Sequence, residues 1–180
     1  MDAIFAIDKP VGPTSHDVVA RIRRAARLRR VGHAGTLDPL ASGVLVVALG
    51  NATRLVEYLT ADDKAYRAVI DFGSETATDD AEGDVTRTGP VDHLDATAIT
   101  AALDAFRGTI TQVPPSYSAI SVGGERLHAL ARRGVAVEAP PRRVTIDAID
   151  LIAWEAPRAT IDIATVRYRI VRAESPPEDA

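Results

Sequence analysis

The sequence predicts an α+β fold (mixed α/β), in which strands and helices share one domain of 180 residues. Three observations support this class. The chain is long enough to bury a full hydrophobic core. Its hydrophobic fraction of 46% and charged fraction of 26% are ordinary for a globular protein. Apolar residues recur with a period of two in some segments and at helical spacing in others.

The first third of the chain predicts two strands and two helices. Residues 3–8 read as a short buried strand that ends in a turn rich in proline. Ser15 is the expected N-cap of a helix that runs to about Arg27. The continuous apolar run 44–49 is typical of a central strand. Residues 52–59 predict a short helix, whose inward-facing residues are expected to be Leu55, Val56 and Leu59.

The middle of the chain predicts a strand, an acidic loop and a helix. Residues 64–73 alternate with a period of two, which places Tyr66 on the same face as the apolar positions. The loop 73–84 lacks the alternating carboxylates and closing glutamate of a calcium-binding EF-hand. Asp95 is expected to cap a helix that runs to about Phe106, with Gly108 as its stop signal. Its inward-facing residues are expected to be Ile99, Leu103 and Phe106.

The last third predicts an inserted segment, two strands and an acidic tail. Residues 113–141 are expected to begin as an extended segment that contains prolines and to continue as a short amphipathic helix over 125–133. Segments 144–153 and 159–171 read as strands, and a shift of alternation near 163–164 predicts a bulge. Residues 173–180 are acidic and contain proline, so they are expected to be disordered.

Composition excludes several function classes. The chain has no cysteine, which excludes disulfides and thiolate sites and leaves the redox compartment open. No signal peptide is evident at the N-terminus, and no apolar run reaches membrane-spanning length. No Walker motif, dinucleotide fingerprint or zinc ligand cluster occurs. We therefore expect a cytoplasmic protein that contacts no membrane and uses no cofactor or metal.

The glycine-rich run 32–43 is the candidate active site. Pro39 biases Asp38 toward an extended conformation, which places Asp38 on a loop. A carboxylate between apolar Leu37 and Leu40, kept ionised by nearby arginines, suits a nucleophile or a general base. The alternative is an ordinary turn, since Asp-Pro pairs and glycine-rich loops before buried strands are common.

The charges are unevenly distributed. The formal net charge is −4 at pH 7, which by itself argues against a nucleic-acid partner. Six arginines nevertheless fall within ten residues, and the acids collect elsewhere; these six are Arg21, Arg23, Arg24, Arg27, Arg29 and Arg30. They predict either a phosphate-binding surface or a solvated helix face.

The twelve residues 32–43, Gly-His-Ala-Gly-Thr-Leu-Asp-Pro-Leu-Ala-Ser-Gly, resemble the central motif of the TruB family of bacterial tRNA pseudouridine synthases. By this resemblance Asp38 is the catalytic nucleophile, and His33 helps to hold the target nucleotide out of the RNA stem-loop. The Lys-x-Tyr segment at the start of the 64–73 strand resembles a second motif, whose tyrosine, here Tyr66, stacks on the flipped base. Asp8-Lys9-Pro10 resembles the opening motif, which implies that Lys9 lies near the cleft and binds RNA; an exposed turn lysine is the alternative.

The resemblance also implies an architecture. The expected catalytic domain, 1–172, has a largely antiparallel sheet flanked by helices, with Asp38 in a central cleft and the insertion 113–141 closing on RNA through Arg126, Arg132 and Arg133. The family has lysine where Ser121 stands, and it carries Lys-Gly-Thr-Tyr-Ile-Arg where this chain has only residues 166–172. The arginine of that motif pairs with the catalytic aspartate. The domain is therefore expected to be incomplete at its C-terminal end and to lack an RNA-binding PUA domain.

The function implied is isomerisation of uridine to pseudouridine in the T-arm loop of tRNA, at position 55, by a monomer that needs no protein partner. One alternative is a truncated protein of the same family that binds tRNA without turnover. A second is a hydrolase that pairs Asp38 with Asp8 or Asp71, which requires two facing carboxylates. A third is the related enzyme of guide-RNA particles, which the long insertion argues against.

Overall fold

The computed structural model describes residues 1–60, 62–114, 121–122, 125–126, 133 and 140–169. They fall into two compact units, Met1–Asp62 and Asp63–Ala180. Each unit has its own sheet and its own hydrophobic core. Every strand pairing among the described residues is antiparallel, and helices accompany both sheets, so the α+β class is confirmed.

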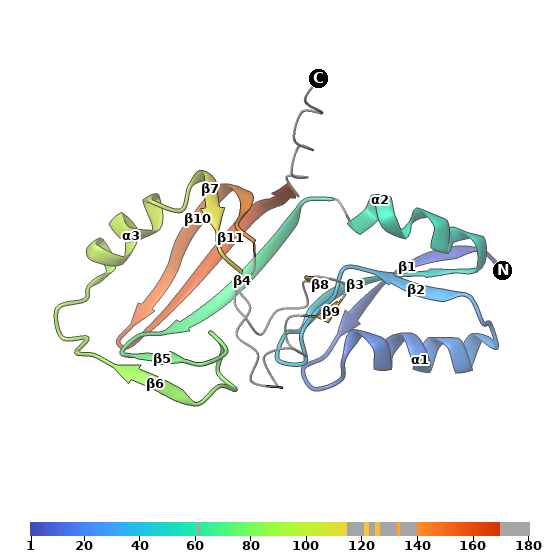
Figure 1. Ribbon diagram of the computed structural model, residues 1–180, viewed down its shortest axis with the longest axis horizontal. Coiled ribbons are helices and arrows are strands. Elements are labelled where there is room, and N and C mark those ends of the chain that lie inside the picture. Colours follow the sequence, from blue (N-terminus) through green and yellow to red (C-terminus); the bar gives the residue numbers. More distant parts are fainter. Residues whose placement is uncertain (61, 115–120, 123–124, 127–132, 134–139, 170–180) are drawn as a thin grey trace, which may run out of the picture. The chain divides into compact units, whose positions relative to one another are not determined.

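The first unit is a three-stranded sheet with helix α1 packed on one face (Figure 1). Its elements are β1 (Ala3–Lys9), α1 (Ser15–Ala26), β2 (Val31–Ala34), β3 (Gly43–Leu49), the 3-10 helix η1 (Gly50–Leu55) and α2 (Val56–Thr60). The strand order is β1-β3-β2, so the apolar run on β3 is the central strand, as predicted. Leu45, Val47 and Leu49 of β3 are buried against Val18 and Val19 of α1.

Helix α1 begins one residue earlier than predicted. Thr14, with φ −72° and ψ 160°, is the N-cap and forms a capping box with Asp17. Ser15 is therefore the first helical residue, and its hydroxyl is not used in the cap. The helix ends at Arg27, whose φ of 51° is left-handed, a conformation that usually selects glycine.

In the first unit the sequence analysis missed one strand, and one of its local predictions was wrong. No strand was assigned to residues 31–34, but they pair with β3 as an edge strand, with His33 opposite Val47. Four residues that include a glycine carry no clear strand period, so pairing with β3 decides their conformation. Leu55 was expected to face inward, yet it is 48% exposed, because the segment starts as a 3-10 helix and presents a different face.

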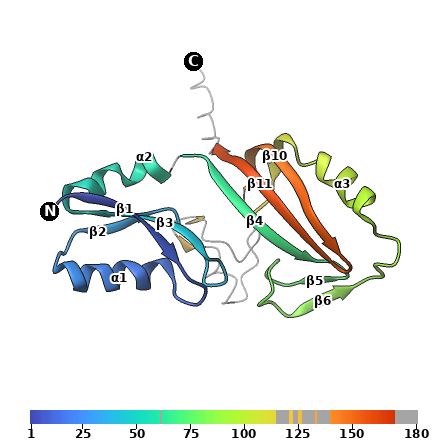
Figure 2. The ribbon, with the colours of Figure 1, turned by 180° about the vertical axis from the view of Figure 1, so that it is seen from behind.

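The second unit is a four-stranded sheet of order β4-β11-β10-β7 with α3 packed against β10 (Figure 2). Its elements are β4 (Lys64–Asp71), β5 (Ser74–Thr76), β6 (Val85–Thr88), α3 (Ala96–Asp104), β7 (Gly108–Gln112), β8 (Ser121–Val122), β9 (Glu125–Arg126), β10 (Arg142–Glu155) and β11 (Arg158–Arg169). Asp95 caps α3, and Ile99 and Leu103 are buried, as predicted. Phe106 is 49% exposed, because α3 ends at Asp104 and the apolar stripe ends with it.

The predicted bulge is confirmed: the register between β11 and β4 shifts between Ile163 and Val166. The acidic loop 73–84 forms the first half of the β5–β6 hairpin. Glu125 and Arg126 pair with β8 as a strand, so the helix expected over 125–133 does not begin there. The rest of that helix, with Arg132, lies outside the described residues, as do the side chain of Arg126 and the tail 173–180.

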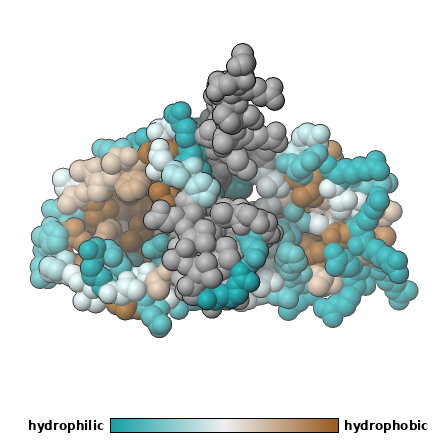
Figure 3. Space-filling view, in the orientation of Figure 1, coloured by the Kyte–Doolittle hydropathy of each residue, from teal (hydrophilic) through white to brown (hydrophobic). Residues whose placement is uncertain are grey.

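Hydrophobic residues gather between α3 and the β5–β6 hairpin on the face of the second unit seen in Figure 3, whereas hydrophilic side chains cover α1 of the first unit.

In the described parts of the chain, no helix is both long enough and apolar enough to cross a bilayer.

Candidate active site

Asp38 lies on the loop 35–42, which connects the edge strand β2 to the central strand β3. Gly35 and Gly43, with φ of +89° and +134°, bound this loop in conformations that side chains disfavour. The Asp38 carbonyl accepts a hydrogen bond from the Ala41 amide at 3.0 Å, which closes a turn. Asp38 is exposed, so its carboxylate is open to a ligand and not desolvated by its apolar neighbours.

The backbone on either side of Asp38 is held by the segment that opens α1. The Ser15 hydroxyl accepts from the Leu37 amide at 2.9 Å and donates to the Leu37 carbonyl at 3.0 Å. The Gly12 amide donates to the Pro39 carbonyl at 2.8 Å. By contrast, the described residues offer no hydrogen bond or ion pair to the Asp38 carboxylate itself. The loop is therefore fixed through its backbone, and the acid stays available.

His33 is a half-buried residue of β2, and it lies two residues before the start of the loop 35–42. Its Nδ1 is 2.6 Å from the Gly35 carbonyl oxygen. Because a carbonyl can only accept, Nδ1 carries the hydrogen, and Nε2 has no hydrogen-bond partner among the described residues. The ring of His16, in the first turn of α1, stands edge-on to His33 with centroids 5.3 Å apart. Sequence reasoning missed His16, since nothing in the local pattern relates position 16 to position 33.

Lys9 ends β1 and is completely buried. Its Nζ donates to the carbonyls of Pro10 and Pro13, each at 2.9 Å. Lys9 is therefore not the exposed turn lysine of the alternative expectation, and its buried ammonium presents no exposed charge to an RNA. Its two hydrogen bonds instead hold the turn that leads into α1.

The arginine-rich segment lies toward the far end of α1. Ser15, at the first turn, is bonded to Leu37, whereas Arg23 and Arg24 are in the last turn of this 12-residue helix, about 12–14 Å further along its axis. Arg23 donates to the Val31 carbonyl at 3.0 Å, and Arg30 donates to Asn51 at 3.2 Å. Nearby arginines had been expected to keep Asp38 ionised, but among the described residues none of these arginines forms an ion pair with Asp38.

These arginines nevertheless form an available basic surface. Within the described residues, none of the six makes an ion pair with an acid, although all six are exposed. Five arginines of the second unit do pair with an acid; these are Arg67, Arg87, Arg107, Arg133 and Arg158. An exposed segment whose arginines make no ion pair suits an anionic partner.

Tyr66 belongs to the second unit, at the start of β4 and opposite Ile163. It shares a face with Ala68 and Ile70, which pack against the core, but it is itself 40% exposed. The ring therefore lies past the end of the core. Asp38, His33 and Lys9 belong to the first unit, and Tyr66 belongs to the second.

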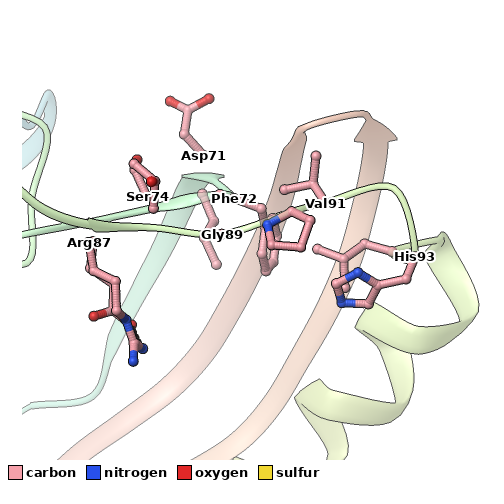
Figure 4. Close-up of a pocket in the computed structure, with 13 residues that line it drawn as sticks. Asp71, Phe72, Ser74, Arg87, Gly89, Val91 and His93 are labelled. Carbon is pink, nitrogen blue, oxygen red and sulfur yellow. Dashed lines mark hydrogen bonds and ion pairs between the residues drawn. The ribbon is translucent and has the colours of Figure 1, made fainter.

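A separate cavity of about 490 Å³ lies in the second unit, between the end of β4, the β5–β6 hairpin and residues 89–94 (Figure 4). Phe72 lines it, and three of its charged groups are already paired: Asp71 with Arg158 at 2.6 Å, and Glu75 with Arg87, which lines the cavity too. None of the residues singled out as catalytic or RNA-binding lines this cavity.

The acidic loop is organised by its own hydrogen bonds. The Asp80 carboxylate accepts from the Thr78 hydroxyl at 2.6 Å and from the Glu82 amide at 2.9 Å, and these bonds lower the pKa of Asp80. Over the described residues, no group of three or more histidine, aspartate or glutamate side chains is arranged to hold a metal ion.

Comparison with known proteins identifies relatives of the chain. Residues 23–167 match the TruB family pseudouridylate synthase (N terminal domain). The chain is 48% identical over 176 residues to tRNA pseudouridine synthase B of Trichormus variabilis, covering 96% of this chain and 60% of that protein. It is 54% identical over 145 residues to the Thermobifida fusca protein of the same name, covering 81% and 50%. This chain thus spans about half to three fifths of these relatives.

Solved structures show the same fold in more distant proteins. A Cbf5-Nop10-Gar1 complex contains a chain that is 28% identical, with a TM-score of 0.61 over 94% of this chain and 41% of that one. An H/ACA RNP bound to a substrate RNA gives 26% identity and a TM-score of 0.62, over 94% and 39%. With the family match covering most of its residues, the chain belongs to the TruB family of pseudouridylate synthases.

Proposed function

We propose that this chain is the catalytic part of a tRNA pseudouridine synthase, which converts uridine to pseudouridine in the T-arm loop of tRNA. Two observations support the proposal. Its relatives at 48–54% identity are named tRNA pseudouridine synthase B, and the twelve-residue motif ends in a backbone-anchored loop that presents the exposed Asp38. The second observation carries the assignment of the active site.

The reaction needs little besides a carboxylate and a pocket. The C1′–N1 bond breaks, a C1′–C5 bond forms, the C5 hydrogen leaves as a proton and N1 gains a proton. No electrons are gained or lost, so no redox cofactor is required. We assign Asp38 as the nucleophile that acts on the nucleotide, since an ionised carboxylate without an internal partner is free to do so. Its attack on C1′ or on C6 of the base gives different covalent adducts.

The target base is stacked within a folded loop, and flipping it out costs a few kcal/mol. We assign two side chains to this step. His33, fixed by its bond to the Gly35 carbonyl, presents Nε2 toward the nucleotide. Tyr66, whose ring is 40% exposed at a strand end, offers a face for the base to stack on.

The phosphates of the RNA require positive charge. The exposed arginines of the 21–30 segment have no acidic partners among the described residues, so they can bind phosphates without first breaking an ion pair. Lys9 is not assigned to RNA binding, because it is fully buried and holds turn carbonyls. The name shared by its bacterial relatives supports tRNA as the substrate. We further propose that the protein acts as a monomer and needs no protein partner.

The test is release of tritium from a T-arm stem-loop RNA that carries uridine labelled at C5. The 180-residue chain should release one tritium per RNA, and Asp38→Asn should release none. Because Asp38 is exposed and its carboxylate has no partner within the described residues, Asp38→Asn should change the free energy of unfolding by less than about 0.5 kcal/mol. Release by Asp38→Asn at the wild-type rate would exclude Asp38 as the acting group.

A second candidate is a tRNA-binding protein of the same family that does not turn over its RNA. It is favoured by the sequence at 166–172, which does not match the motif whose arginine pairs with the aspartate in the family. Equal RNA binding by the wild type and Asp38→Asn, with no tritium released by either, would support this candidate against the first.

A further inference from the structure

Ser15 holds the residue that precedes the proposed nucleophile. Its Oγ accepts a hydrogen bond from the Leu37 amide at 2.9 Å and donates one to the Leu37 carbonyl at 3.0 Å, across 22 residues of sequence. Ser15 itself is 1% exposed. A buried hydroxyl that both donates to and accepts from one residue fixes the position of that residue more firmly than a single bond would.

This hydroxyl has no other task at the start of α1. A serine in this position is usually an N-cap, but here Thr14 accepts from the Asp17 amide, and Asp17 accepts from the Thr14 amide in return. The cap is therefore complete without Ser15. The Ser15 hydroxyl is therefore free to make a long-range contact with the loop 35–42.

The contact has a counterpart on the other side of the acid. The Gly12 amide donates to the Pro39 carbonyl at 2.8 Å, so both neighbours of Asp38 are bonded to the segment that opens α1. The Asp38 carboxylate has no hydrogen bond or ion pair of its own within the described part of the chain. Its location is consequently set by these two backbone attachments and not by its own side-chain partners.

We propose that Ser15 is a positioning residue, which places the Asp38 carboxylate for attack on the flipped nucleotide. The proposal rests on the function proposed above. Loss of the hydroxyl would release the loop on the N-terminal side of Asp38, and misplacement of a reacting group by about 1 Å can reduce a rate by roughly 100-fold. RNA binding should change little, because Ser15 is buried and does not touch RNA.

The experiment compares Ser15→Ala, Ser15→Thr and Thr14→Ala with the wild type. Single-turnover release of C5 tritium measures the chemical step, and filter binding of the same T-arm RNA measures affinity. Ser15→Ala should lower the single-turnover rate by about 10- to 100-fold with a change in Kd of less than about threefold. Ser15→Thr keeps the hydroxyl and should recover most of the rate.

Thr14→Ala is the matched control for helix stability. It removes the cap of α1 but leaves the Ser15–Leu37 contact, so it should lower the thermal midpoint with nearly the wild-type rate when folded. Amide hydrogen exchange gives a readout that does not depend on activity: exchange at Leu37 should accelerate in Ser15→Ala, whereas exchange at buried Val47 should not.

The outcomes separate this proposal from the proposed function. If the wild type releases tritium and Ser15→Ala releases it equally fast, the positioning role is excluded although the function stands. Equal losses of rate in Ser15→Ala and Thr14→Ala would likewise exclude it, since they would indicate a general effect of helix stability. If the wild type itself releases no tritium, the proposed function fails, and the positioning role fails with it.

Discussion

The ring of His16 stands edge-on to the ring of His33, with centroids 5.3 Å apart and planes at 80°. This contact connects the first turn of α1 to β2, the strand that precedes the loop 35–42. A second link, from Nδ1 to the Gly35 carbonyl, holds the His33 ring as well. The orientation of His33 is therefore set by one group that is near in the sequence, Gly35, and by one that is distant, His16.

Replacement of His16 by alanine should remove one of these two supports. Edge-to-face aromatic pairs contribute about 0.5–1.5 kcal/mol, so we expect His16→Ala to reduce the single-turnover rate by roughly 2- to 10-fold. His16→Phe keeps a ring at this position and should retain most of the rate. A rate for His16→Ala equal to that of the wild type would show that the Gly35 bond alone orients His33.

Lys9→Met tests whether the buried ammonium is structural. The substitution keeps the volume but leaves the Pro10 and Pro13 carbonyls without their donor, which should reduce the free energy of unfolding by about 1–3 kcal/mol. Urea denaturation would measure this. The salt dependence of RNA affinity should keep its slope, because Lys9 contacts no phosphate. A decrease of that slope with no loss of stability would instead indicate direct RNA contact.

Arg27→Gly should separate charge from stability in the arginine-rich segment. Arg27 has a left-handed φ of 51°, so glycine should raise the free energy of unfolding by about 1 kcal/mol. If Arg27 binds an RNA phosphate, the same change should lower the slope of log affinity against log salt by about 0.7–0.9. Arg87→Gln is the control, because Arg87 is already paired with Glu75, and its slope should match the wild type. An unchanged slope in Arg27→Gly would show that Arg27 does not bind an RNA phosphate.

The capping box of α1 should make stability depend on pH in acid. Hydrogen bonds from the Thr14 hydroxyl and the Thr14 amide lower the pKa of Asp17 below its ordinary value of 3.8. A carboxyl whose pKa is lower in the folded state stabilises the fold above the unfolded pKa, and this contribution is lost as pH falls through the folded pKa. The thermal midpoint should therefore decrease as the pH is lowered below about 4, over the range between the unfolded and the folded pKa of Asp17.

Asp17→Asn provides the comparison, since its amide oxygen can still accept from Thr14 but does not titrate. Its thermal midpoint should fall less steeply than that of the wild type between about pH 4 and pH 2. Identical pH profiles for the two proteins would show that the capping carboxylate does not contribute to the acid sensitivity.

By itself, the sequence determined the elements whose signals are local. The apolar run 44–49 forms the central strand β3, Asp95 caps α3, and the interrupted alternation near 163 marks the bulge of β11. Each of these depends on side chains within a few residues of one another. The motif at 32–43 also identified the family, because twelve consecutive residues carry a pattern that needs no tertiary information.

Only the tertiary structure decided the partners of the site. Ser15 was expected to be a cap and instead bonds Leu37. Lys9 was expected to bind RNA or to be an exposed turn residue, and it is buried; His16 carried no signal at all. The partners of Ser15 and His16 lie on segments that are distant in the sequence, and Lys9, which bonds carbonyls of the adjacent turn, is buried by the packing around it. A hydroxyl, an ammonium or an imidazole binds whichever group the folded chain brings within about 3 Å. That choice is made by the packing of distant segments, which no local pattern of residues records.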